Sequence, residues 1–306
     1  MTYKVHRASN SAACRIAVVI ATRGRPVVAA AIVRRLMQQS RLPDHVFVVG
    51  SQASDIAEVE FNAEKITAVV GRVGSSHQRN DGLKMVGNSF DLVVFFDDDF
   101  VPSHFWIERM AQIFVAHPDV AGLTGTILDD GSATKGISLA EADVAVRSKD
   151  ADATVCRTIL PRFGYGGNVG CNMAYRVSAL GSIRFDENLP RYAWQEDSDF
   201  RGQVERRGEF VRALDLWGVH LGHKLGRSSG VALGYAQIAN SIYLGRKGTV
   251  PRWYMARLAF KNFVANTIKS VFPEPFVDRR GRLKGNLMAF GDLLLGRIAP
   301  NRSPKM

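Results

Sequence analysis

The apolar positions of this chain fall into short continuous runs separated by longer segments with helical spacing. The runs RIAVVIA, HVFVVG, ITAVV and DLVVFF are rich in β-branched and aromatic residues, which predicts four buried strands. Between the first two, Pro26 precedes Val28, Ile32 and Leu36 at helical spacing, which predicts a helix over 26–39. A second helix is predicted over 76–88. This alternation predicts an α/β fold with a mostly parallel sheet covered by helices on both faces.

The second half of the chain predicts a further set of elements. Pro102 is expected to open a helix that continues to about Ala116, and VAGLTGTIL reads as a strand. Residues 129–170 carry few large apolar runs, so they are expected to form a long irregular segment that contacts substrate. Regular structure resumes with a strand at CNMAYR, a helix that begins near Glu196 and stops at Gly208, a strand at FVRALDLW and a helix from about 230 to Gly245.

Charge is spread unevenly along the sequence. The net charge is +11, and residues 251–306 hold eleven Lys and Arg against three acids, a net +8. Apolar and aromatic residues recur in this segment at helical spacing, which favours membrane headgroups over nucleic acid as its anionic partner. A terminal helical pair that packs on the core with a solvated basic face explains the pattern equally well. We therefore expect a lead-in over 1–14, a main domain over 15–250 and a basic amphipathic extension over 251–306.

Cysteine usage and hydropathy indicate the cellular compartment of the protein. Cys14, Cys156 and Cys171 show no paired or metal-ligand spacing, which argues against a disulfide framework and against a zinc site. No apolar run approaches the roughly 18 residues needed to cross a bilayer, and the first residues lack the apolar stretch of a signal peptide. A cytoplasmic protein is expected.

Three consecutive carboxylates end the fourth predicted strand. Ligands of open α/β sheets collect at the carboxyl ends of strands, and Asp97, Asp98 and Asp99 lie at such an end. Residues i and i+2 of an extended chain point the same way, so Asp97 and Asp99 can converge on a hard cation such as Mn²⁺ or Mg²⁺. A solvated acidic turn is the alternative. In either case the three charges repel one another unless positive groups lie nearby.

Other polar residues are candidates for the same site. Asp197 lies in the first turn of a predicted helix and could act as a general base, although acids there also complement the helix dipole. His220 could complete a metal shell or be a structural histidine. Arg227, beside serines and a glycine, could bind phosphate oxygens or lie in a solvated loop. Thr22 could equally be a helix cap, and Arg79 a surface arginine.

The order of these motifs resembles a known family. TRGRP, QRN, DDD, GCNMAYR, FDE and QED follow one another as in the inverting glycosyltransferases of family 2, which have the GT-A fold. The resemblance covers about residues 15–223. It implies a donor-binding half over 15–128, an acceptor half over 129–250, and Asp197 as the acceptor base. The roles that the resemblance carries over fall on Thr22, Arg79, Asp97, Asp99 and Asp197. Together with the other candidates above, the predicted metal ligands are Asp97, Asp99 and His220, and the predicted donor contacts are Thr22, Arg23, Arg79, Asp97, Asp98 and Arg227.

The resemblance also implies a function. We expect a transferase that uses Mn²⁺ or Mg²⁺ to move one sugar from a nucleotide diphosphate sugar to a hydroxyl of a glycan or lipid-linked acceptor. Bacterial envelope or exopolysaccharide synthesis, with peripheral contact at the inner membrane face, fits this expectation. The Gln-x-x-Arg-Trp pattern of processive synthases is missing, which favours single additions. Gly50 stands where the family has an aspartate that contacts the nucleotide base, so neither base nor sugar is specified.

Two alternative functions compete with this expectation. A nucleotidyltransferase would need a glycine-rich phosphate loop after the first strand, and TRGRP is short and poor in glycine. A non-catalytic module that binds an anionic surface through 251–306 would leave the aspartate triple and Glu196-Asp197 without a purpose.

Overall fold

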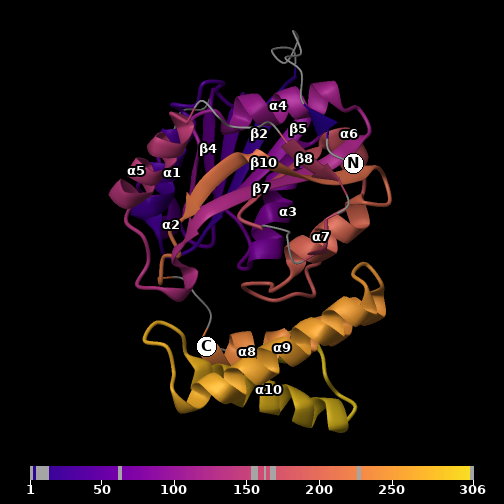
Figure 1. The fold of residues 1–306 in the computed structure, drawn as a ribbon. Helices are drawn as coiled ribbons and strands as arrows, with labels where there is room; N and C mark the ends of the chain where they lie inside the picture. Colours follow the sequence, from indigo (N-terminus) through magenta and orange to yellow (C-terminus); the bar gives the residue numbers. More distant parts are fainter. Residues whose placement is uncertain are drawn as a thin grey trace. The chain divides into compact units, whose positions relative to one another are not determined.

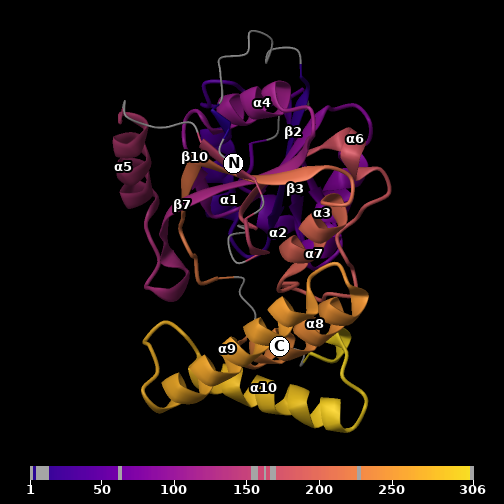
Figure 2. The same cartoon turned by 45° about the vertical axis from the view of Figure 1, so that its right-hand side comes forward.

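The computed structural model divides the chain into two compact units, which are described separately (Figures 1 and 2). Unit 1 comprises residues 1–72, 78–184 and 204–225, and unit 2 comprises 73–77, 185–203 and 226–306. Within these limits the structure describes residues 3–4, 14–60, 64–152, 158–161, 163–165, 170–225 and 229–303.

Unit 1 is built on a ten-stranded mixed sheet. Its strands are β1 (Tyr3–Lys4), β2 (Ile16–Thr22), β3 (His45–Gly50), β4 (Ile66–Val70), β5 (Leu92–Asp97), β6 (Phe100–Pro102), β7 (Val120–Asp130), β8 (Thr158–Pro161), β9 (Asn172–Arg176) and β10 (Glu209–His220). The order is β1-β8-β10-β7-β9-β5-β2-β3-β4, and β6 pairs with β10. Strands β5, β2, β3 and β4 are parallel, as are β7 and β10, whereas β9 is antiparallel to both β5 and β7.

Helices cover both faces of the parallel part of the sheet. They are α1 (Pro26–Leu36), α2 (Ala53–Ile56), α3 (Ser75–Val86), α4 (Trp106–Ala116), α5 (Leu139–Asp150) and α6 (Val177–Leu180). Strand residues alternate between faces, and those of β2 at even positions join the core formed with α1 and α4. On the other face α3 lies close to β2, since a Cβ on Gly82 would fall 2.4 Å from Cγ1 of Val19. The α/β class with a helix-covered sheet is thereby confirmed.

Two local predictions were wrong. Pro102 does not open a helix: it ends β6 opposite Gly218 of β10, and α4 begins only at Trp106. The segment 129–170 is not irregular throughout, because β7 extends to Asp130 and α5 follows. Helix α5 begins with a capping box in which the Ser138 hydroxyl accepts from the Glu141 N–H and the Glu141 carboxylate accepts from the Ser138 N–H.

Unit 2 is helical. It contains most of α7 (Glu196–Val204), together with α8 (Gly230–Lys247), α9 (Arg252–Val271), α10 (Arg279–Leu294) and a short 3₁₀ turn at Pro300–Arg302. Helices α8 and α10 approach each other at glycines, since a Cβ on Gly234 would fall 2.0 Å from the carbonyl oxygen of Arg282. The predicted helical C-terminal part is therefore present. No helix in the described part of the chain combines the length and apolar character needed to span a bilayer. The domain limits expected from the sequence stay a prediction.

Candidate active site

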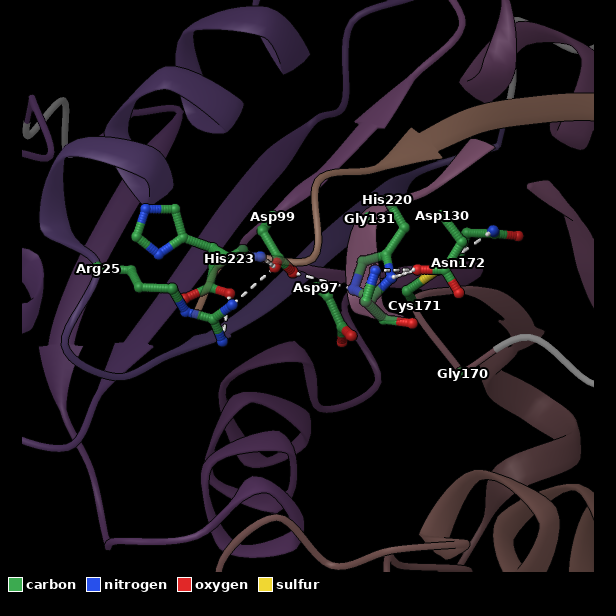
Figure 3. A network of polar contacts seen from close by, with 12 residues as sticks. Arg25, Asp97, Asp99, Asp130, Gly131, Gly170, Cys171, Asn172, His220 and His223 are labelled. Atoms are coloured by element: carbon green, nitrogen blue, oxygen red, sulfur yellow. Dashed lines mark hydrogen bonds and ion pairs between the residues drawn. The ribbon is translucent and has the colours of Figure 1, made fainter. Parts of the chain in front are cut away.

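Strand register in unit 1 gathers one cluster of acids and a histidine. Asp97 ends β5, and the pairing of β6 with β10 sets Phe100 opposite His220, so Asp99 falls beside the end of β10. The pairing of β7 with β10 sets Asp130 opposite His220. As a result Asp97, Asp99 and His220 each offer one ligand atom within 4.8 Å of the others (Figure 3).

Each of the three consecutive aspartates has a positive partner. Arg79 Nη2 lies 2.7 Å from Asp97 Oδ1, and Arg79 itself is buried. Arg25 spans the other two carboxylates, with Nη2 2.9 Å from Asp98 Oδ1 and Nη1 2.8 Å from Asp99 Oδ2. These pairs supply the compensation that three adjacent like charges require.

Asp98 turns inward, away from the metal-ligand cluster. Its carboxylate is buried and accepts a 2.6 Å hydrogen bond from the Thr22 hydroxyl. Burial raises the pKa of Asp98 above its ordinary value, although the charge of Arg25 acts in the opposite direction. The hydrogen bond from Thr22 and the ion pair with Arg25 thus connect the turn between β2 and α1 to Asp98, at the end of β5.

Asp99 is also buried, yet it stays ionised. Burial alone would raise its pKa, but hydrogen bonding to His220, the charges of His220 and Arg25, and the backbone N–H of His223 lower the pKa overall. That N–H donates to Asp99 Oδ2 at 2.9 Å. A buried, ionised carboxylate at a strand end is a ready ligand for a hard cation.

His220 lies between two carboxylates. Its Nε2 is 3.3 Å from Asp99 Oδ1, and its Nδ1 is 2.9 Å from Asp130 Oδ1 (Figure 3). Burial lowers the pKa of His220, but the hydrogen bonds to Asp130 and Asp99 and the charges of Asp99 and Asp97 outweigh it and raise the pKa to about 10. The imidazole is thus fixed at both nitrogens, with Nε2 on the side of Asp99.

This donor set fits a divalent cation. Two carboxylates and one imidazole suit Mn²⁺ or Mg²⁺, and Asp97 remains about one third exposed, so the cluster is open to solvent. A metal-binding histidine usually donates its second N–H to a carboxylate, and Asp130 occupies that position next to His220. Asp130 would therefore hold the ring with Nε2 facing the cation, which would displace the Nε2 proton that the raised pKa of His220 retains.

A second set of contacts shapes the ends of β2 and β3. The carboxylate of Asp55, which is fully buried, accepts hydrogen bonds from the Gly24 N–H at 2.8 Å and the Ser51 hydroxyl at 2.6 Å. Gln78 Nε2 donates to the carbonyl oxygens of Thr22 and Val49. Asp55 is thereby occupied in joining two loops. No carboxylate lies at residue 50, since that residue is glycine.

Asp197 lies in unit 2, in the first turn of α7, where it is half-buried. Burial and the charge of Asp197 both raise the pKa of Tyr254. The segment before α7 is strained, because Arg191, Ala193 and Gln195 all have positive φ, at 57°, 47° and 71°. Strain of this kind costs about 1–3 kcal/mol per residue and clusters at functional sites.

Two neighbours of Asp197 in α7 contribute to structure. Asp199 is fully buried and binds Lys247 Nζ at 2.8 Å and the Thr249 hydroxyl. Glu196 accepts a 3.2 Å hydrogen bond from the Ser75 hydroxyl. Of the acids in this turn, Asp197 is the most accessible for chemistry.

The structure therefore treats the candidate residues differently. Six of them lie together in unit 1: Thr22, Arg79, Asp97, Asp98, Asp99 and His220. Arg23 lies partly exposed in the same turn as Thr22, and Arg227 falls outside the described residues. Asp197 belongs to unit 2, so its role stays a prediction.

Sequence reasoning missed two residues of this cluster. Arg25 lies in the TRGRP turn without a predicted role, although the need for positive charge beside three aspartates is a signal for it. Asp130 falls in the segment that the sequence predicts to be irregular. Nothing in the local sequence pairs Asp130 with His220; the pairing follows from the register of β7 and β10.

Comparisons with known proteins bear on the family and the fold. Residues 13–153, just under half of the chain, match the family model described as "Glycosyltransferase like family 2". No curated protein sequence matches the chain.

Several solved structures share the fold at low sequence identity. S. aureus TarS 1-349 matches with a TM-score of 0.52 at 13% identity, covering 84% of this chain and 73% of TarS 1-349. Glucosyl-3-phosphoglycerate synthase from Mycobacterium tuberculosis gives 0.51 at 16% identity, with 79% and 82% covered. Mannosyltransferase PcManGT from Pyrobaculum calidifontis, in complex with GDP-Man and Mn²⁺, gives 0.50 at 14% identity, with 92% and 80% covered. The chain therefore has the GT-A fold of these glycosyltransferases, and its residues 13–153 match the family 2 model.

Proposed function

We propose that this glycosyltransferase is metal-dependent and inverting, and that it moves one sugar from a nucleotide diphosphate sugar to a hydroxyl acceptor. The observation that carries the proposal is the convergence of Asp97, Asp99 and His220 at the carboxyl ends of β5 and β10. PcManGT, which shares the fold, was solved with GDP-Man and Mn²⁺. The acceptor is proposed to be a glycan or a lipid-linked carrier, reached from the cytoplasmic side of a bacterial envelope.

The residues of unit 1 would prepare the leaving group. Asp97, Asp99 and His220 would hold a divalent cation, which when bound neutralises charge on the departing diphosphate. Arg25 and Arg79 lie on the flanks of the cluster, within 2.9 Å of its carboxylates, and would add positive charge close to the phosphates. Thr22, fixed by Asp98, would line the nucleotide pocket.

Asp197 would activate the acceptor. In a single displacement the acceptor oxygen attacks the anomeric carbon as the bond from that carbon to the diphosphate oxygen breaks. The hydroxyl proton must leave as this bond forms, and the Asp197 carboxylate would take it. Attack from the face opposite the leaving group inverts the anomeric configuration.

The proposal is tested by donor binding and turnover. Nucleoside diphosphates are titrated into the protein with and without Mn²⁺, and the melting temperature is followed, because a ligand that binds only the folded state raises it. UDP and GDP are the first choices, since TarS was solved with UDP and PcManGT with GDP-Man. A rise that needs Mn²⁺, followed by release of the same diphosphate from its sugar donor, supports the proposal. A metal-independent rise would contradict metal dependence.

Restoring the family aspartate at residue 50 is expected to destabilise the protein. A Cβ at Gly50 would fall 2.8 Å from Ile56 Cγ2 and 3.1 Å from Asp55 Cβ, so Gly50→Asp crowds a buried turn and places a second carboxylate beside Asp55. We expect a loss of about 1–3 kcal/mol in the free energy of unfolding, measured by urea denaturation.

The matched control for this variant is Gly164→Asp, because nothing lies within 4 Å of a Cβ at Gly164. The control should unfold like the parent protein. If Gly50→Asp were equally stable and gained affinity for UDP, the packing argument would be wrong.

Removing the carboxylate that holds His220 is expected to weaken metal binding. Asp130→Ala leaves Asp97, Asp99 and His220 in place but frees the Nδ1 side of the ring, so Mn²⁺ affinity should fall about 10- to 100-fold. Isothermal titration with Mn²⁺ measures this in the absence of any donor. Asp129→Ala, at the neighbouring exposed position of β7, is the control. Equal Mn²⁺ affinity in both variants would remove Asp130 from this role.

A further inference from the structure

The outer face of α9 is apolar. Trp253, Phe260 and Val271 are 67%, 69% and 63% exposed, and their spacing of 7 and 11 residues places them in one line along the helix. Ile268, 66% exposed, lies beside this line. A surface helix usually buries such residues against the core, so this exposed apolar stripe indicates an interaction surface.

The buried face of the same helix is polar in its second half. Asn266 is fully buried, and its Nδ2 donates to Gln237 Oε1 of α8 at 2.8 Å and to Asn286 Oδ1 of α10 at 2.9 Å. Gln237 also donates to Asn262 Oδ1 at 3.1 Å. These hydrogen bonds fix the rotation of α9 about its axis, because turning the stripe inward would leave buried amides without partners.

Further apolar side chains are exposed in the segments that follow α9. The connection between α9 and α10 exposes Phe272 and Phe276, which are 86% and 51% accessible, and α10 exposes Leu287 and Leu294, which are 55% and 89% accessible. We call the exposed apolar residues of this part of unit 2 the α9–α10 face: Trp253, Phe260, Ile268, Val271, Phe272, Phe276, Leu287 and Leu294. Single exposed apolar side chains are common, but a run of this length along two helices is not.

Positive charge accompanies the α9–α10 face. Arg257 and Lys261 flank the stripe on α9, Lys284 lies on α10, and none of the three forms an ion pair with a carboxylate among the described residues. A groove of about 490 Å³ at Lys284 combines cations with apolar side chains; it is lined by Ser270, Arg280, Leu283, Lys284, Leu287 and Met288. Cations beside apolar side chains suit a phospholipid, whose headgroup is anionic and whose chains are apolar.

We propose that the α9–α10 face lies on an anionic lipid bilayer, with its aromatic and aliphatic side chains in the headgroup and acyl boundary and its lysines and arginines against the phosphates. No helix in the described part of the chain can span the bilayer, so the contact is interfacial. The proposal rests on unit 2 alone and does not depend on the proposed transfer chemistry.

Charge argues against a second copy of the chain as the occupant. Residues 251–306 carry a net +8, so pairing two such faces would oppose two strongly positive surfaces. Nucleic acid would be attracted by the charge, but phosphate contacts make no use of exposed Phe260, Val271 and Leu294. A lipid surface uses both the charge and the apolar area.

The test is co-sedimentation of the full chain with vesicles. We expect binding to vesicles of phosphatidylcholine and phosphatidylglycerol at 3:1, much weaker binding to phosphatidylcholine alone, and weaker binding at high salt. Phe260→Ser should reduce partitioning about tenfold or more, because it removes the transfer of one aromatic side chain from water. Arg257→Gln with Lys261→Gln should reduce it about 25-fold, from about fivefold for each cation lost near the surface.

The control is Val144→Ser on α5, which removes a side chain that is 70% exposed and lies in unit 1. This variant should bind vesicles like the parent protein, and all variants should keep its melting temperature. Failure to bind either vesicle, or equal binding by Phe260→Ser, would overturn the proposal. A parent dimer that Phe260→Ser converts to a monomer would assign the face to a second copy instead. Binding to vesicles by a protein with no transferase activity would leave this inference standing and defeat the proposed function.

Discussion

Asp197→Asn is expected to lower kcat for sugar transfer by about 10²- to 10⁴-fold, the usual contribution of a general base. Asn has almost the same shape as Asp but cannot take the acceptor proton. Asp197 is half-buried in the first turn of α7, so we expect this small change to leave the fold intact. Rates are measured at saturating donor and acceptor with Mn²⁺ present.

The same variant provides its own control for binding. Mn²⁺ affinity and the Mn²⁺-dependent rise in melting temperature with nucleoside diphosphate should equal those of the parent protein, since Asp97, Asp99 and His220 are untouched. Near-normal kcat would show that another group accepts the proton. Loss of nucleotide binding together with activity would assign Asp197 to the donor pocket rather than to the acceptor.

Asp97→Asn is expected to abolish detectable metal-dependent transfer and to weaken Mn²⁺ binding by about 10²-fold or more. Removal of a supporting residue outside the ligand set already costs 10- to 100-fold, and Asp97 would be a ligand itself. The variant also leaves buried Arg79 beside a neutral amide, so its melting temperature must be recorded. Mn²⁺ binding is followed by isothermal titration and by the electron paramagnetic resonance signal of the free ion.

Asp119→Asn serves as the matched control. Asp119 is exposed and directly precedes β7, whereas Asp130 lies at the other end of that strand. It should bind Mn²⁺ and transfer sugar like the parent protein. A folded Asp97→Asn variant with parental Mn²⁺ affinity would mean that the cation site lies elsewhere. Together, Asp97→Asn and Asp197→Asn separate metal binding from proton transfer, since only the first should lose Mn²⁺.

The parallel half of the sheet could be predicted because its strands are buried on both faces. Strands β2, β3 and β5 therefore read as continuous apolar runs, which are easy to recognise in a sequence. Asp97 and Asp99 converge, as the i, i+2 spacing of an extended chain predicts, although β5 ends at Asp97 and Asp99 lies in the turn before β6. For Asp97 and Asp99, the local sequence alone is therefore enough to predict that the two carboxylates converge.

The other half of the site depends on pairing between distant strands. The apolar run VAGLTGTIL predicts that β7 ends two residues before Asp130, and only the register with β10 places Asp130 beside His220. Helix α5 was missed because it buries little, with Ala142 and Val146 as its buried residues, so its apolar spacing is weak. Its capping box was the readable signal. Strand register and ion pairs between distant residues cannot be predicted from any single segment of the sequence.

The ion pairs around Asp97, Asp98 and Asp99 affect the order of folding and metal binding. Arg25, Arg79 and His220, whose raised pKa keeps it charged at neutral pH, balance Asp97, Asp98 and Asp99 before any ion or donor arrives. In a structural zinc site the chain cannot fold until the metal binds, because the ligands have no other partner. Here each ligand already has one. We therefore expect the chain to complete its fold without divalent ions and to take up the proposed cation afterwards.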